Sequence, residues 1–150
     1  MNAPSLTTGR PLTAAATASR RNTTLESSAE LVGRVLLGSL FLLSGLSKLG
    51  AYGATAAYMS SAGVPSALLP AVIAVELLGS LAVIVGWKTR VAAALLAGFS
   101  LLAAFLFHNN FADQTQMIMF LKNVSITGGF LLLVANGAGR ISLDRRADRA

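Results

Sequence analysis

Five side chains that could take part in chemistry interrupt long apolar stretches of the sequence: Lys48, Glu76, His108, Lys122 and Asn123. A charge near the centre of a lipid bilayer costs about 2.5–3.5 kcal/mol on insertion scales, so such residues usually face the interior of a helix bundle. We therefore interpret the five residues as one intramembrane polar cluster. Their depths predict a site that opens toward one side of the membrane, with Glu76 at its floor.

Within this cluster the sequence favours an ion pair between Glu76 and Lys122. Lys122 lies roughly 7 Å and Glu76 roughly 13 Å inside their apolar runs at the rise of an α-helix, a gap that a lysine side chain can span. Two alternatives stay open. Lys48 and Lys122 could instead extend to the headgroups, and His108 could be an interfacial residue or a helix cap.

The helical phases of these residues support an inward orientation. Arg34, Gly38, Phe41, Gly45 and Lys48 are spaced by four, three, four and three positions, which places them on one stripe of a helix. Glu76, His108 and Lys122 each share a helix face with small residues in the same way. Small residues let membrane helices approach closely, so the charges are predicted to point into the bundle. Arg34 itself is interpreted as an anchor at the inner face.

Several kinds of chemistry lack the residues they need. The chain has no cysteine and a single histidine, which leaves no thiolate ligands for an iron–sulfur cluster and no histidine pair for a haem. No phosphate loop, metal set or nucleophile with a base partner is present, so we assign no catalytic residue, no metal site and no resident cofactor. The net charge of +6 is spread between apolar runs and does not form the stripe that nucleic-acid binding needs.

Four apolar runs must position the cluster, at residues 31–49, 67–87, 91–108 and 117–135. Each is close to the roughly 20 residues that a helix needs to cross a bilayer. The composition agrees, because 54% of residues are hydrophobic and only 12% are charged. We predict an all-α membrane protein with a four-transmembrane-helix bundle at residues 29–140. A disordered tail is predicted at 1–28 and a polar tail at 141–150.

The distribution of Lys and Arg predicts the orientation of the bundle. The N-terminal segment through Arg34, the second loop and the C-terminal segment from Arg140 hold ten of these residues, whereas the first loop with Lys48 holds one and the third loop none. Because cytoplasmic loops carry the excess of positive charge, both termini are predicted to be cytoplasmic.

The order and spacing of these features resemble the DoxX-like family of small membrane proteins. The resemblance covers residues 30–144 and rests on segment 34–49, on Glu76 with Gly79 and Gly86, and on Lys122 with the glycines and tail that follow it. Ser80 stands where a second glycine is common. The family is named for a small subunit of an archaeal quinol-oxidising, thiosulfate-linked complex, and its bacterial members are mostly inner-membrane proteins of unassigned role.

The resemblance implies an accessory or binding subunit of a membrane redox or quinone-linked system in a bacterial-type inner membrane. A quinone is then the implied cofactor, and a protein partner or a second copy of the chain is the expected partner besides the lipid bilayer. The alternative is a small-solute carrier that uses the polar pocket between the helices. Transporters commonly contain an internal repeat or an interrupted helix. The sequence shows neither feature, which makes the carrier the less favoured alternative. The sequence assigns no enzymatic activity.

Overall fold

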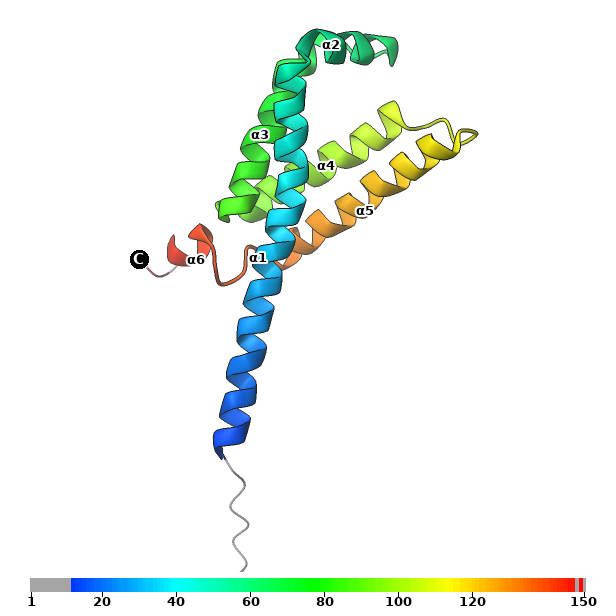
Figure 1. The fold of residues 1–150 in the computed structure, drawn as a ribbon. Helices are drawn as coiled ribbons and strands as arrows, with labels where there is room; N and C mark the ends of the chain where they lie inside the picture. Colours follow the sequence, from blue (N-terminus) through cyan, green and yellow to red (C-terminus); the bar gives the residue numbers. More distant parts are fainter. Residues whose placement is uncertain (1–11, 148, 150) are drawn as a thin grey trace, which may run out of the picture.

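A computed structural model describes residues 12–147 and 149 of the chain (Figure 1). These residues contain α-helices, one 3-10 turn and no strand. The elements are α1 (Leu12–Gly50), α2 (Tyr52–Ser61), η1 (Ser66–Leu68), α3 (Leu69–Val85), α4 (Thr89–Phe107), α5 (Gln114–Asn136) and α6 (Leu143–Ala147).

The predicted set of four membrane helices is confirmed. Four described segments are long and apolar enough to cross a bilayer: Thr24–Gly50, Ser66–Val85, Thr89–Phe107 and Gln114–Asn136. The last of these segments begins three residues before the fourth apolar run, because Asp113 caps its N-terminus. The Asp113 carboxylate accepts hydrogen bonds from the amides of Thr115 and Gln116. A hydropathy reading misses this polar first turn, which is specified by its cap.

Three α-helical segments fall where the sequence predicted none. The apolar run predicted a helix from residue 31, whereas α1 begins at Leu12. The tail predicted at 1–28 thus lies partly outside the described residues, and its part from residue 12 onward is helical here; its disorder in solution stays a prediction. Alanine favours helix, and extending an existing helix needs no new nucleus. The other two segments are α2, within the connection between the first two spans, and α6, within the tail predicted at 141–150.

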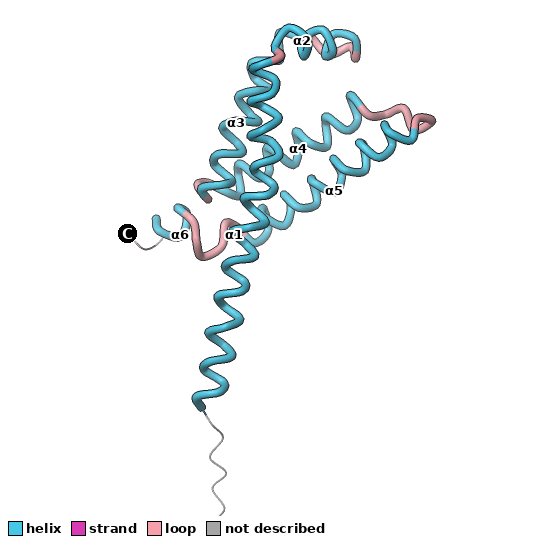
Figure 2. The backbone as a smooth tube through the Cα atoms, viewed as in Figure 1, coloured by secondary structure: helices cyan, strands magenta, loops and turns pink. Residues whose placement is uncertain are grey.

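The helices are arranged as two pairs, α1 with α3 and α4 with α5, joined through contacts between α3 and α4 (Figure 1). The two pairs are close together near α6 and diverge toward the end that carries α2. Figure 2 shows α2 as a short helix that leaves the end of α1 sideways. The described beginning of α1 and the C-terminal segment lie at the same end of the bundle, which we call the tail-side end.

Close contact between α1 and α3 depends on two glycines of the predicted stripe. A Cβ atom on Gly45 would lie 2.7 Å from Cδ2 of Leu77, and one on Gly38 would meet Ile84. Between these two glycines along α1, Phe41 packs edge-on against Phe130 with ring centroids 5.4 Å apart. The stripe therefore faces the bundle, and its aromatic contacts close the narrow part of the space between the helix pairs.

A buried arginine ties the C-terminal segment to the tail-side end. Arg34 is only 1% exposed, and its guanidinium donates hydrogen bonds to the carbonyls of Ala138, Ile141 and Ile84. The latter two hydrogen bonds measure 2.7 and 3.3 Å, respectively. One side chain of α1 thus holds the end of α3 and the segment after α5. The sequence predicted that Arg34 is an anchor at the inner membrane face. In the structure Arg34 is buried and its hydrogen-bond partners are carbonyl groups of the protein.

Asp144 makes the second attachment of this segment. Its carboxylate accepts hydrogen bonds from the amides of Lys88, at 2.6 Å, and Thr89, at 2.9 Å, at the N-terminus of α4. Its own amide donates to the carbonyl of Gly86 at 2.8 Å. Burial alone would raise the pKa of Asp144, but the hydrogen bonds from Thr89 and Lys88 and the charge of Arg34 outweigh it and lower the pKa below 3.8. The attachment therefore carries a negative charge at neutral pH.

Candidate functional site

A cavity of about 430 Å³ occupies the space where the two helix pairs diverge. Its walls come from α1, α3, α4 and α5, and α2 contributes Thr55, Tyr58 and Met59. Most of the lining is apolar. The cavity is large enough for a small organic molecule or the head of a lipid-soluble one.

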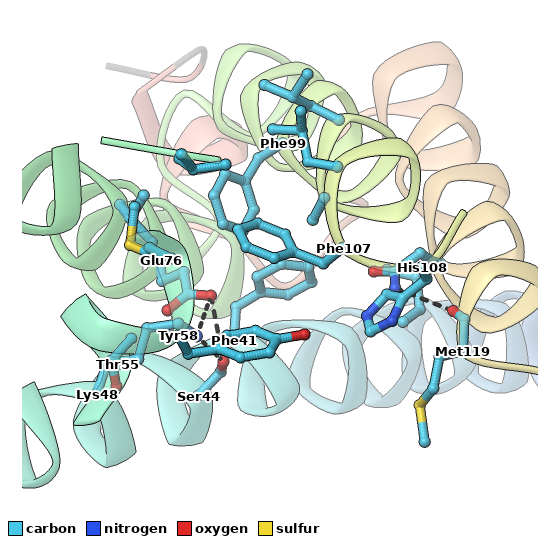
Figure 3. A pocket seen from close by; sticks show the side chains of 18 of the residues that line it. Phe41, Ser44, Lys48, Thr55, Tyr58, Glu76, Phe99, Phe107, His108 and Met119 are labelled. Atoms are coloured by element: carbon cyan, nitrogen blue, oxygen red, sulfur yellow. Dashed lines mark hydrogen bonds and ion pairs between the residues drawn. The ribbon is translucent and has the colours of Figure 1, made fainter. Parts of the chain in front are cut away.

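One end of the cavity holds a buried ion pair. The ammonium of Lys48 donates to Oε1 of Glu76 at 2.9 Å and to the hydroxyl of Ser44 at 2.6 Å. The Ser44 hydroxyl lies 3.2 Å from the same carboxylate oxygen (Figure 3). The side chain of Glu76 is 3% exposed and that of Lys48 is 24% exposed. An ammonium has three donors, so the partners found among the described residues leave one N–H of Lys48 for a ligand.

The carboxylate of Glu76 is only half satisfied. Its Oε2 is buried and has no hydrogen-bond partner among the described residues. Leaving a charged acceptor unpaired costs more than leaving a neutral one unpaired. A water or a ligand donor that reached this oxygen would therefore be held strongly.

The other polar end of the cavity is built around His108. The Nδ1 atom of His108 lies 2.8 Å from Oε1 of Gln116. When Nδ1 donates this hydrogen bond, Nε2 of the neutral ring is an acceptor, and it becomes a donor only on protonation. The amide of Asn123 donates to the carbonyl of Met119 at 3.0 Å, and its oxygen lies 3.1 Å from the Ser100 hydroxyl.

Aromatic side chains separate the two polar ends. Figure 3 shows Phe41, Tyr58 and Phe107 between the Lys48–Glu76 pair and His108. The rings of Tyr58 and Phe107 are stacked with centroids 5.5 Å apart. A flat ring placed here would contact aromatic faces and could meet a hydrogen-bonding group at either edge.

All five residues of the predicted cluster line this one cavity: Lys48, Glu76, His108, Lys122 and Asn123. The predicted ion pair between Glu76 and Lys122 is wrong, because the partner of Glu76 is Lys48. Lys122 is exposed, and its ammonium contacts the sulfur of Met119 at 3.8 Å. The physical reason is that α1 packs along α3, whereas α5 diverges from α3. Lys48 therefore reaches Glu76 and Lys122 stays at the rim.

The sequence did not predict the contributions of Ser44, Tyr58, Phe107 and Gln116. Ser44 precedes Lys48 by one helical turn, which was a usable signal for a shared face. Tyr58 belongs to α2, a helix that hydropathy did not indicate. Among the described residues, no group of three or more His, Cys, Asp or Glu side chains could hold a metal ion.

Comparison with known proteins gives a consistent family. The family model described as DoxX matches residues 29–109. Inner membrane protein YqjF of Escherichia coli (strain K12) is 48% identical over 121 residues, which cover 81% of this chain and 93% of that protein. Inner membrane protein YphA of the same organism is 39% identical over 124 residues, covering 77% of this chain and 88% of that protein. No solved structure matches the chain.

Proposed function

Since the chain belongs to the DoxX family and is a multi-pass inner membrane protein, we propose that it is a binding or accessory subunit of a membrane redox or quinone-linked system. The observation that supports this proposal is the cavity between the helix pairs. It combines an aromatic middle with hydrogen-bonding groups at both ends, and most of its lining is apolar.

A quinone has the chemistry that this cavity suits. Its ring is flat and apolar, and it carries an oxygen at each of two opposite edges. The free N–H of Lys48 can donate to one oxygen. At the other edge, His108 can accept from the hydroxyl of a quinol through Nε2, or donate to a quinone carbonyl when the ring is protonated.

The chain's own residues bind and orient such a ligand and do not supply electrons. Without cysteine and with one histidine, the sequence has no thiolate cluster or bis-histidine haem. Electrons would pass between the quinone and a partner subunit. The proposed role is therefore accessory, because this chain would bind the quinone and a partner subunit would exchange electrons with it.

The packing between the cavity and the tail-side end favours a binding site over a path through the membrane. Phe41 contacts both Phe130 and Phe99, with ring centroids 5.4 and 6.2 Å apart. These three rings fill the space between the helix pairs toward the tail-side end. A carrier would have to open this packed region on each transport cycle, which makes that alternative the less supported one.

Purification in a mild detergent tests the proposal. We expect the intact chain to retain a quinone through purification and to bring a redox protein with it when expressed at its natural level. The measurement is chromatography of the extracted lipids together with mass spectrometry of the co-purified proteins. Recovery of neither a quinone nor a redox protein would reject the proposed function.

We further propose that the tail-side end is cytoplasmic, on the basis of the ten Lys and Arg residues in the N-terminal segment through Arg34, the second loop and the C-terminal segment from Arg140. Reporter fusions after Gly63, Lys88, Asp113 and Arg149 should read periplasmic, cytoplasmic, periplasmic and cytoplasmic. A periplasmic reading at Arg149 would contradict this orientation, since an even number of spans leaves both ends on one side.

A further inference from the structure

A basic surface surrounds the docked C-terminal segment at the tail-side end. It consists of five exposed cations, Lys88, Arg90, Arg140, Arg145 and Arg146. They come from separate parts of the chain that meet here. The amide of Lys88 binds Asp144, and the guanidinium of Arg90 lies beside Gly137, 3.4 Å from where a Cβ atom would stand.

None of these five cations forms an ion pair with an acidic side chain within the described residues. The one ion pair found there within 4 Å joins Lys48 and Glu76 in the cavity. Two described acids lie at the same end, within or against the C-terminal segment: Asp144, whose carboxylate oxygens accept hydrogen bonds from backbone amides, and Glu30, whose carboxylate lies beside Gly139. The five cations outnumber these two acids, so the surface keeps a net positive charge.

Exposed apolar side chains accompany the cations. Trp87 is 55% exposed, Ile141 is 51% exposed and Leu143 is 43% exposed. The ammonium of Lys88 lies 5.3 Å from the centroid of the Trp87 ring. Tryptophan concentrates at the boundary between lipid headgroups and acyl chains, so this combination suits the interface of a bilayer.

The positions of the tail arginines are fixed by the attachments of the C-terminal segment. Arg34 and Asp144 hold the segment as described above. In addition, the Ser142 hydroxyl donates to the carbonyl of Gly139 at 2.8 Å and accepts from the amide of Arg145 at 3.2 Å. A basic tail that acted only as a topology signal would need charge but no such defined position.

We propose that this basic surface binds the headgroups of acidic phospholipids in the leaflet at the tail-side end. The guanidinium groups bind the lipid phosphates, since their planar donors match phosphate oxygens in pairs. Trp87, Ile141 and Leu143 contact the acyl region beside them. The inference is independent of the quinone proposal, because it concerns the other end of the bundle and a different class of ligand.

The test is a titration of the purified full chain in detergent with phosphatidylglycerol, and in parallel with phosphatidylcholine, following bound lipid by native mass spectrometry. The chain should bind phosphatidylglycerol selectively. Arg145→Gln combined with Arg146→Gln should weaken that binding about 25-fold, because each basic residue near an acidic lipid surface contributes about fivefold in affinity. Arg145→Gln alone should weaken the binding about fivefold, whereas Lys122→Gln, the same single charge change at the far end, should leave the affinity for phosphatidylglycerol unchanged.

A second variant separates a built site from simple charge attraction. Asp144→Ala removes the attachment to α4 while making the surface more positive. A fixed site predicts weaker phosphatidylglycerol binding by this variant, whereas charge alone predicts equal or tighter binding. Equal affinity for the two lipids, an unaffected arginine double variant, or equal or tighter binding by Asp144→Ala would each overturn the proposal.

Discussion

Arg34→Met is expected to lower the free energy of unfolding by about 3 kcal/mol or more. The guanidinium satisfies the carbonyls of Ala138, Ile141 and Ile84. Each carbonyl that loses its partner in a buried setting costs about 1–3 kcal/mol. Methionine keeps much of the apolar stem, so the loss reports mainly the missing hydrogen bonds. The measurement is equilibrium unfolding of the purified protein in mixed detergent micelles.

Two further variants make the Arg34 result specific. Arg34→Lys keeps the charge but replaces the planar guanidinium by a compact ammonium, so it should lose part of the stability. Leu36→Met, at a position on the same helix that is 67% exposed, should be close to neutral. Equal stability of Arg34→Met and Leu36→Met would show that the C-terminal segment is not held by Arg34.

The second large effect is expected at the ion pair in the cavity. Lys48→Met should destabilise the protein by about 3 kcal/mol, since it leaves the buried carboxylate of Glu76 without a counter-charge. Glu76→Gln should cost less, because Lys48 is more exposed and can turn its ammonium toward the membrane surface. The double variant should recover much of the loss, as a neutral pair leaves no buried charge.

Lys122→Met is the matched control for Lys48→Met. Both replace a lysine that lines the cavity, but Lys122 is exposed and forms no ion pair among the described residues. It should therefore change stability by less than about 0.5 kcal/mol, as surface substitutions usually do. If Lys122→Met lowers the free energy of unfolding more than Lys48→Met in the same assay, the partner of Glu76 is Lys122 and not Lys48.

These residues show how far the sequence could predict the site. Helical phase, which depends only on spacing along each helix, predicted that Lys48, Glu76 and Lys122 face inward. All three line the cavity, but Lys122 is exposed at its rim. Helical phase could not show which lysine meets Glu76, because that depends on which helices pack side by side. The pairing of α1 with α3, made close by Gly38 and Gly45, decides the matter.

Other parts lacked a local signal altogether. The partners of Arg34 are backbone carbonyls more than a hundred positions later in the chain, or at the end of α3, and any residue type could supply them. Helix α2 contains Gly53 and Thr55 and has no long apolar run, so hydropathy did not separate it from a loop. For the same reason, the sequence did not predict that Thr55, Tyr58 and Met59 of α2 line the cavity.

The most direct test of the account is the amount of quinone bound per chain in a cavity-filling variant. Ala103 lines the cavity, whereas Ala135 is an exposed residue of α5. The account predicts that the wild-type chain and Ala135→Phe carry similar amounts of quinone after mild purification, and that Ala103→Phe carries little or none. Equal quinone in Ala103→Phe and Ala135→Phe would contradict the claim that the cavity is the binding site.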